Sequence, residues 1–158
     1  MAVQLAANTG AHVIGTASGR NEQFLRDLGI DEFVNYREEQ FEDVIDDVDL
    51  VLDAIGGEVL ERSAEVVQSG GVIVTLPDQP EADTVERFQA EHDVAIRFFD
   101  VLTESDPAIL QSVTDRVAGG VFEPTISGSY PLSEAQEGLD RSANGHVRGK
   151  LVVDVTTD

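Results

Sequence analysis

The sequence has no cysteine and no tryptophan, and it has no long apolar run. Without cysteine, the chain forms no disulfide and offers no thiolate ligand to a metal. No apolar stretch approaches the roughly 18 residues that a membrane-spanning helix needs. Residues 1–12 carry no basic group ahead of their apolar part, so we expect no signal peptide. These absences together predict a cytoplasmic protein.

Basic residues are scarce as well. Lys and Arg total 10 against 31 Asp and Glu, which gives a formal net charge of −21 at pH 7, and Lys150 is the only lysine. A surface of this sign repels nucleic acid and anionic membranes, so we expect neither as a partner. Two interpretations remain: an acidic interaction or disordered protein, or a globular domain from a high-salt cytoplasm. The acids lie between periodic apolar segments, which favours the halophilic domain.

The apolar residues, 41% of the chain, predict an α/β fold with one real core. Alternation of strands and helices implies a parallel sheet wound in right-handed crossovers. The apolar run Asp49–Ile55 is typical of a strand buried on both faces. Strands are expected at 12–16, 33–36, 49–55, 72–76 and 94–99, and helices at 1–7, 20–28, 38–46, 58–67, 84–91 and 107–118. The tail predicts a strand at 125–130, a helix at 133–142 opened by the capping pattern S-E-A-Q, and a strand at 150–155.

The stretch HVIGTASGRN, residues 12–21, carries the clearest functional signal. An NAD-selective site normally keeps an acid after this strand to bind the ribose 2′-hydroxyl. Here Ser18, Arg20 and Asn21 follow the strand instead. A hydroxyl, a guanidinium and an amide suit a 2′-phosphate, so the stretch predicts an NADP(H) site. The alternative is a purely structural one, in which Ser18 or Asn21 caps the next helix.

Several segments taken together resemble the medium-chain dehydrogenase/reductase superfamily, in its zinc-independent NADPH:quinone oxidoreductase-like branch. They occur in the family's order: AVQLA, VIGTAS-x-x-N, LGIDEFVNYRE, VDLVLDAIGG, GGVIV, FFDV, YPLSEAQEGLD and GHVRGKLVV. The resemblance implies a doubly wound Rossmann-type parallel sheet over residues 1–122. It also implies that residues 123–158 form a C-terminal segment, which joins the catalytic domain in full-length relatives.

The sequence departs from the family at its start. Family members place a strand and an A-x-G-G-V-G turn directly before the helix that matches AVQLA, and this sequence contains neither. Those glycines let the backbone approach the cofactor pyrophosphate. Because the missing strand is the central one, segments 12–16 and 49–53 should become two unpaired sheet edges. Either they pair with each other, or a partner chain supplies the strand, or the domain is marginally stable. The tail strands should expose apolar surface or dock elsewhere.

The resemblance also implies further cofactor contacts beside Ser18, Arg20 and Asn21. Tyr36 would lie beside the adenosine phosphate, and the backbone at 55–57 and 76–77 would line the ribose. Phe98, Phe99 and Val101 would meet the nicotinamide carboxamide. The basic groups of HVRGK would reach the cofactor. The residues so implied are Tyr36, Ile55, Gly56, Gly57, Leu76, Pro77, Phe98, Phe99, Val101, Arg148 and Lys150. The alternative for each is ordinary turn chemistry, core packing or a solvated surface.

The sequence offers no candidate catalytic residue and no metal site. The histidines, His12, His92 and His146, are scattered, and Asp53 has no base or nucleophile beside it in the sequence. A nicotinamide carries the hydride chemistry itself, so the protein needs only to position it. We therefore expect an NADP(H)-dependent quinone or enone reductase-like fragment, inactive alone. The partner is a second copy, through strand 94–99, or a complementing N-terminal chain. The alternative is a non-catalytic nucleotide-binding or oligomerisation module.

Overall fold

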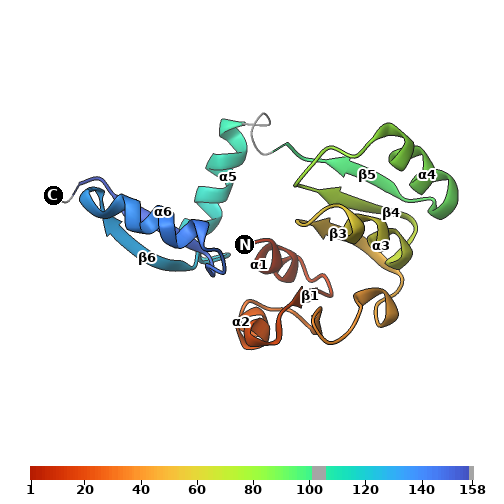
Figure 1. The fold of residues 1–158 in the computed structure, drawn as a ribbon, viewed down its shortest axis with the longest axis horizontal. Helices are drawn as coiled ribbons and strands as arrows, with labels where there is room; N and C mark the ends of the chain where they lie inside the picture. The colour runs from red at the N-terminus through yellow and green to blue at the C-terminus, as the bar shows by residue number, and fades with distance from the viewer. Residues whose placement is uncertain (101–105, 157–158) are drawn as a thin grey trace. The chain divides into compact units, whose positions relative to one another are not determined.

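The structure is a computed structural model that describes residues 1–100 and 106–156 (Figure 1). The chain forms two compact units. One is His12–Leu110, and the other combines Met1–Ala11 with Gln111–Asp158. Within the described residues, no helix is both long and apolar enough to cross a membrane.

The unit His12–Leu110 alternates strands and helices, as predicted. Its elements are β1 (Ile14–Ala17), the 3-10 turn η1 (Gly19–Asn21), α2 (Glu22–Asp27), β2 (Glu32–Asn35), the 3-10 turn η2 (Phe41–Asp43), β3 (Val48–Asp53), α3 (Glu58–Val66), β4 (Val67–Thr75), α4 (Ala82–His92) and β5 (Ala95–Phe98). Every strand pair is parallel. The α/β class with parallel strands is therefore confirmed.

The strands of this unit form two sheets rather than one. β1 pairs with β2, and β3, β4 and β5 form a sheet in that order. Among the described residues, β1 and β3 each have a strand on one side only. The possibility that these two edges pair with each other is therefore wrong. The doubly wound sheet is interrupted at the position where the resemblance placed its missing strand.

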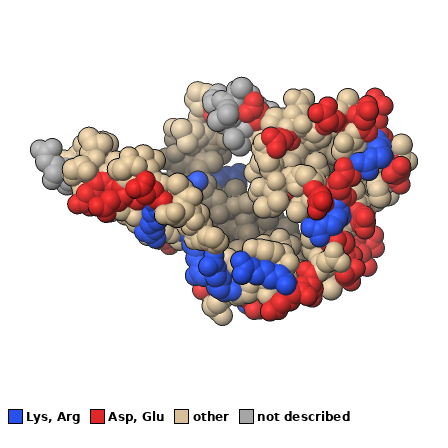
Figure 2. All heavy atoms as spheres, in the orientation of Figure 1, with Lys and Arg blue, Asp and Glu red and all other residues tan. Residues whose placement is uncertain are grey.

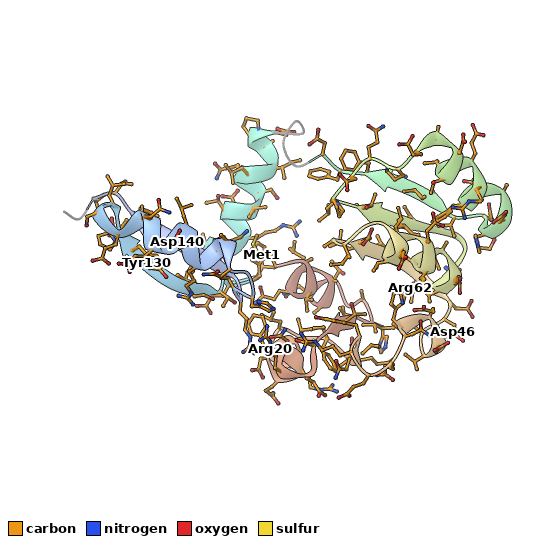
Figure 3. The ribbon with its side chains drawn as sticks, viewed as in Figure 1. Met1, Arg20, Asp46, Arg62, Tyr130 and Asp140 are labelled. Carbon is orange, nitrogen blue, oxygen red and sulfur yellow. The ribbon has the colours of Figure 1, made fainter. Side chains whose placement is uncertain are left out.

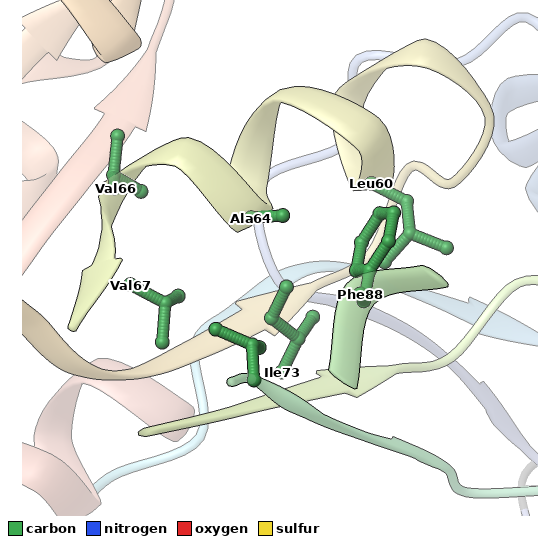
Figure 4. Packing of buried hydrophobic residues seen from close by; sticks show 7 residues of the cluster. Leu60, Ala64, Val66, Val67, Ile73 and Phe88 are labelled. Atoms are coloured by element: carbon green, nitrogen blue, oxygen red, sulfur yellow. The ribbon is translucent and has the colours of Figure 1, made fainter. Parts of the chain in front are cut away.

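The core of the unit lies between the three-stranded sheet and the helices α3 and α4 (Figure 4). Ile73 of β4 and Phe88 of α4 are fully buried and pack in one cluster with Leu60 and Ala64 of α3. Burying a side chain such as Ile73 or Phe88 contributes about 1.5–3 kcal/mol to folding. The periodic apolar residues of both helices therefore pack as their spacing predicts.

The prediction that β3 is buried on both faces is wrong. Val51 lies beside the buried Ile73 and packs against the core. Leu50 and Leu52, which point to the opposite face, are 55% and 45% exposed. The physical reason is that α3 and α4 pack on the same face of the sheet. The other face of β3 therefore presents leucines without a cover from those helices.

The predicted helix at 38–46 is also wrong, because only the short turn η2 forms there. Two like-charged pairs, Glu38 with Glu42 and Glu39 with Asp43, would face each other one turn apart on a helix and oppose it. The apolar side chains of the segment, Phe41 and Ile45, instead pack against the core cluster. Tertiary contact replaces helical hydrogen bonding in this stretch.

The second unit contains α1 (Ala2–Asn8), most of α5 (Pro107–Ala118), β6 (Ile126–Pro131), the 3-10 turn η3 (Leu132–Glu134), α6 (Ala135–Ala143) and β7 (Lys150–Asp154). β6 and β7 pair in parallel, and the Asn8 amide donates to the Val121 carbonyl oxygen at 2.6 Å. The predicted capping pattern is wrong, because Ser133 lies inside η3 and α6 begins without a side-chain cap. Leu139 and Val155 are exposed, so the tail presents apolar surface.

Candidate functional site

The carboxyl ends of β1 and β2 bring the predicted adenosine-phosphate residues together. Ser18 directly follows β1 and is buried, with 5% of its surface exposed. The Tyr36 amide donates to the Ala17 carbonyl oxygen at 3.3 Å, which places Tyr36 beside the start of the Ser18 loop. Arg20 is exposed in η1, at the end of β1 (Figure 3). Ser18, Arg20, Asn21 and Tyr36 thus share one edge of the small sheet.

The loop geometry differs from that of a helix cap. Neither Ser18, which precedes η1, nor Asn21, which precedes α2, makes a side-chain capping bond. The Asn21 amide instead donates to the Ser18 hydroxyl oxygen at 3.2 Å. The capping interpretation of these two residues is therefore wrong. Their polar groups hold each other within the loop.

Gly19 keeps this loop close to the neighbouring strand. A methyl group added at Gly19 would lie 3.0 Å from the Asn35 side-chain nitrogen. The Asn35 side-chain oxygen in turn accepts a hydrogen bond from the Arg37 amide at 3.3 Å. Sequence reasoning did not single out Gly19 or Asn35. The sequence signal was the small residue between Ser18 and Arg20.

A second group of predicted residues meets at the carboxyl ends of β3, β4 and β5. The register aligns Asp53 with Thr75 and Thr75 with Phe98. The Leu76 amide donates to the Asp53 carbonyl oxygen at 3.0 Å, and the Phe99 amide donates to the Thr75 carbonyl oxygen at 3.1 Å. These bonds carry the residues beyond each strand to one edge of the sheet, where the resemblance places the cofactor ribose and nicotinamide. The predicted residues at this edge are Ile55, Gly56, Gly57, Leu76, Pro77, Phe98 and Phe99.

The turn after β3 needs its glycines. Gly56 and Gly57 have φ angles of +77° and +56°, in the left-handed region that side chains disfavour. A methyl group on Gly56 would lie 3.5 Å from the Pro77 ring, so the turns after β3 and β4 are in contact. Ile55, at the tip, is 70% exposed. The two turns form a small surface of backbone and apolar side chains.

Asp53 ends β3 beside this turn, where the sequence suggests a carboxylate that accepts backbone hydrogen bonds; its contact with Thr75 is the one that sequence reasoning missed. It is 2% exposed, and its carboxylate accepts hydrogen bonds from the Ile55 amide at 2.9 Å and the Gly56 amide at 3.0 Å. The Thr75 hydroxyl donates to it at 3.0 Å. The sequence signal was an acid that ends an otherwise apolar strand, three residues before the first glycine of the turn.

Two of the remaining predicted residues belong to the second unit. Arg148 precedes β7 and Lys150 begins it, both in the second unit, where the Ser127 hydroxyl donates to the Arg148 carbonyl oxygen. Val101 lies outside the described residues. The cofactor roles of these three residues remain predictions.

Charged side chains cover the helical face of the larger unit, with acids in the majority (Figure 2). Arg62 of α3 donates to the Glu42 carboxylate at 2.9 Å. Burial raises the pKa of Glu42, but hydrogen bonds from its own amide and from Arg62 outweigh this effect and leave the pKa below its ordinary value of 4.5. On α4, the hydrogen bond to Glu61 raises the pKa of Arg87. Arg62 and Arg87 are thus each paired with a carboxylate, Glu42 and Glu61 respectively.

Zinc chemistry does not fit the residues present. Zinc sites use converging cysteine, histidine or carboxylate ligands. The chain has no cysteine, and over residues 1–100 and 106–156 no group of three or more histidine or acidic side chains is arranged to hold a metal ion. We therefore derive no catalytic step from a metal.

The fold and its strand-end turns define a Rossmann-type cofactor domain portion, and comparison with known proteins agrees. The quinone oxidoreductase from Coxiella burnetii superposes with a TM-score of 0.81 at 33% identity, over 98% of this chain and 48% of that one. A probable zinc-binding oxidoreductase, mitochondrial, from Arthroderma benhamiae is 32% identical over 90% of this chain and 44% of its own length. The NADPH-dependent alkenal/one oxidoreductase, chloroplastic, of Arabidopsis thaliana is 28% identical over 97% of this chain and 36% of its own.

The zinc-binding dehydrogenase family profile matches residues 28–153. The chain belongs to this family, in the quinone oxidoreductase-like branch of the medium-chain dehydrogenase/reductase superfamily. It spans about half the length of the relatives named above, or less. The matched portion is their cofactor domain.

Proposed function

We propose that this chain is the cofactor-binding portion of an NADP(H)-dependent oxidoreductase that transfers hydride to a quinone or an enone. The observation that carries the proposal is the loop after β1. It gathers Ser18, Arg20 and Asn21 at a strand end where an NAD-selective site would hold an acid. A guanidinium pairs well with a phosphate, because its donors match two phosphate oxygens at once.

The first acid after this loop in the sequence is already engaged. Glu22 begins α2, and its carboxylate accepts two hydrogen bonds from Arg26, at 3.0 and 2.8 Å. This pair directs Glu22 along the helix, toward the next turn. Glu22 is therefore not held as an acceptor for a ribose hydroxyl, which supports the preference for NADP(H).

The chemistry in this proposal comes from the nicotinamide, which supplies the hydride when it is bound. The chain's own contribution is position. The backbone of Ile55–Gly57 and the residues Leu76 and Pro77 would support the ribose, and Phe98 and Phe99 would lie toward the nicotinamide. Quinone or enone as the substrate class rests on the family resemblance alone.

We further propose that an apolar parallel strand outside these 158 residues fills the position between β1 and β3. Two observations support it. Each of the two strands has an edge that no described strand covers, and Leu50 and Leu52 of β3 are largely exposed. A strand there would satisfy backbone donors and acceptors on both sides. Its turn would also bring a cofactor's pyrophosphate near the sheet.

A homodimer through β5 is the proposed assembly. β5 lies at the border of its sheet and pairs with β4 alone among the described strands. An uncovered border strand is a ready template for pairing with another strand. Sedimentation at molar salt tests this assembly: a dimer mass supports it, and a monomer mass at all protein concentrations contradicts it.

Titration with NADPH at molar salt, followed by nicotinamide fluorescence, tests the function. The proposal predicts saturable binding, and tighter binding of NADPH than of NADH. Oxidation of NADPH on addition of a quinone then separates a reductase from a nucleotide-binding module. Because the chain alone is expected to be inactive, both measurements are repeated with the complementing N-terminal part added. Binding without turnover in that complex favours the module, and no binding of either cofactor by the complex contradicts the proposal.

A further inference from the structure

Asp53 carries a buried negative group at the strand-end surface. It is the only acid among the buried polar residues of the described chain, and its carboxylate accepts hydrogen bonds from three donor groups. The Ile55 and Gly56 amides donate from the turn, and the Thr75 hydroxyl donates from the adjacent strand. Gly56 lies 3.0 and 3.1 Å from the two carboxylate oxygens.

A buried carboxylate destabilises the fold unless its hydrogen-bond donors stay in place. A buried carboxylate without hydrogen bonds loses its hydration and gains nothing in return. Thr75 is 1% exposed, so its hydroxyl is shielded from bulk solvent. Thr75 is held in the core strand β4, and its hydroxyl positions the Asp53 carboxylate by a hydrogen bond. The carboxylate in turn positions the Ile55 and Gly56 amides.

The Gly56 and Gly57 carbonyl oxygens accept hydrogen bonds from the Val59 and Glu61 amides of α3, both at 3.2 Å, whereas the amide side of the turn is held by Asp53. Gly56 and Gly57 both adopt positive φ angles, which an unrestrained glycine leaves readily. The tip residue, Ile55, is 70% exposed and packs little. Within the described residues, the hydrogen bonds that the Ile55 and Gly56 amides donate end on the Asp53 carboxylate.

We propose that Asp53 and Thr75 are positioning residues for the cofactor: they hold the Ile55–Gly57 turn in the one backbone conformation that supports the ribose. This inference rests on the proposed function, because it assigns the held turn to a dinucleotide. It differs from a purely stabilising role in one respect. Loosening the turn weakens cofactor binding even in a variant that remains folded.

The test compares four variants. Asp53→Ala leaves both turn amides without an acceptor. Asp53→Asn keeps one acceptor oxygen for those amides and offers its NH₂ to the Thr75 oxygen, so it is the conservative rescue. Thr75→Val removes the hydroxyl at nearly constant shape. Ser63→Ala is the matched control, because Ser63 is 2% exposed and its hydroxyl donates to Val59 within α3, away from the turn.

Two readouts are taken at molar salt: hydrogen exchange of the Ile55 and Gly56 amides, and the Kd for NADPH. We expect Asp53→Ala to speed exchange and to raise the Kd by roughly tenfold or more, the loss typical of a hydrogen bond to a charged group. Thr75→Val should give a smaller change in the same direction. Asp53→Asn should stay close to wild type in both readouts. Ser63→Ala should lower Tm with neither readout changed.

The outcomes separate this inference from the function beneath it. Unchanged exchange in Asp53→Ala overturns the hold on the turn. Faster exchange with an unchanged Kd overturns the positioning role and leaves the proposed function intact. If wild type binds no NADPH, the proposed function fails and the positioning role fails with it, while exchange still reports whether Asp53 holds the turn. If Asp53→Ala does not fold, Thr75→Val decides: an unchanged Kd beside faster exchange overturns the inference.

Discussion

The Arg62 guanidinium lies 2.9 Å from a carboxylate oxygen of Glu42 and 5.1 Å from the centroid of the Phe41 ring. Arg62 of α3 thus makes a salt bridge with Glu42 and a cation–π contact with Phe41, both in the turn η2. This turn lies in the connection between the two-stranded and the three-stranded sheet. The Arg62–Glu42 salt bridge therefore joins the connecting segment to α3. Because both side chains are partly buried, its contribution to stability should be measurable.

Replacing Glu42 with glutamine tests this pair through its pH dependence. The pKa of Glu42 is lowered in the folded chain, so the pair contributes stability above the unfolded value of 4.5 and loses it as pH falls through the folded pKa. We expect Glu42→Gln to lower the free energy of unfolding by about 1 kcal/mol at pH 7. Urea unfolding of both chains should show this difference shrink below pH 4.5. A difference that is constant across this range would contradict the assignment.

Salt should govern the stability of the whole chain. The net charge of −21 produces repulsion between the acidic side chains. The Debye length, beyond which this repulsion is screened, is roughly 3 Å at 1 M salt and roughly 30 Å at 0.01 M, so the repulsion is much stronger at low salt. We expect Tm and circular dichroism to show a loosened fold at low salt and a cooperative one at molar salt. Uncharged osmolytes at equal osmolarity serve as the control. A spectrum and Tm that do not change with salt would refute the halophilic interpretation.

The two faces of the three-stranded sheet should respond differently to truncation. Ile73 is fully buried, so Ile73→Ala should cost about 2–5 kcal/mol of unfolding free energy. Leu52 is 45% exposed, so its side chain gains little free energy from burial. Leu52→Ala should therefore lower the unfolding free energy by less than about 1 kcal/mol. Chemical unfolding at molar salt measures both. An equal loss of unfolding free energy in the two variants would mean that another part of this chain packs against Leu52, and would contradict the prediction.

Much of this fold was predictable from local patterns. The helix Pro107–Ala118 has the predicted bounds, because proline opens it and Gly119 and Gly120 end it. Gly29 follows α2 with a φ of +100°, as a helix-ending glycine should. The segment 38–46 was not predictable, because contacts of Phe41 and Ile45 with a distant core overrode its helical period.

The sequence predicted which residues lie at the candidate site better than it predicted the hydrogen bonds between them. The residue types after each strand indicated Ser18 and Gly56, since parallel strands end at one edge of a sheet. The bond between Asp53 and Thr75 was not, because it depends on a register between two strands that only the fold sets. The interruption between β1 and β3 followed from the family pattern and not from composition.

The preference for a 2′-phosphate is the central claim, and one calorimetric titration tests it directly. Adenosine 2′,5′-bisphosphate and AMP differ only in the 2′-phosphate and need no pyrophosphate cradle. At molar salt, wild type should bind the bisphosphate at least roughly tenfold more tightly than AMP, the size of a charge-assisted contact. Arg20→Ala should abolish most of this preference, whereas Arg116→Ala, which removes the same charge from α5, should keep it. Equal affinity for both nucleotides in wild type, or a preference that survives Arg20→Ala, would contradict the account.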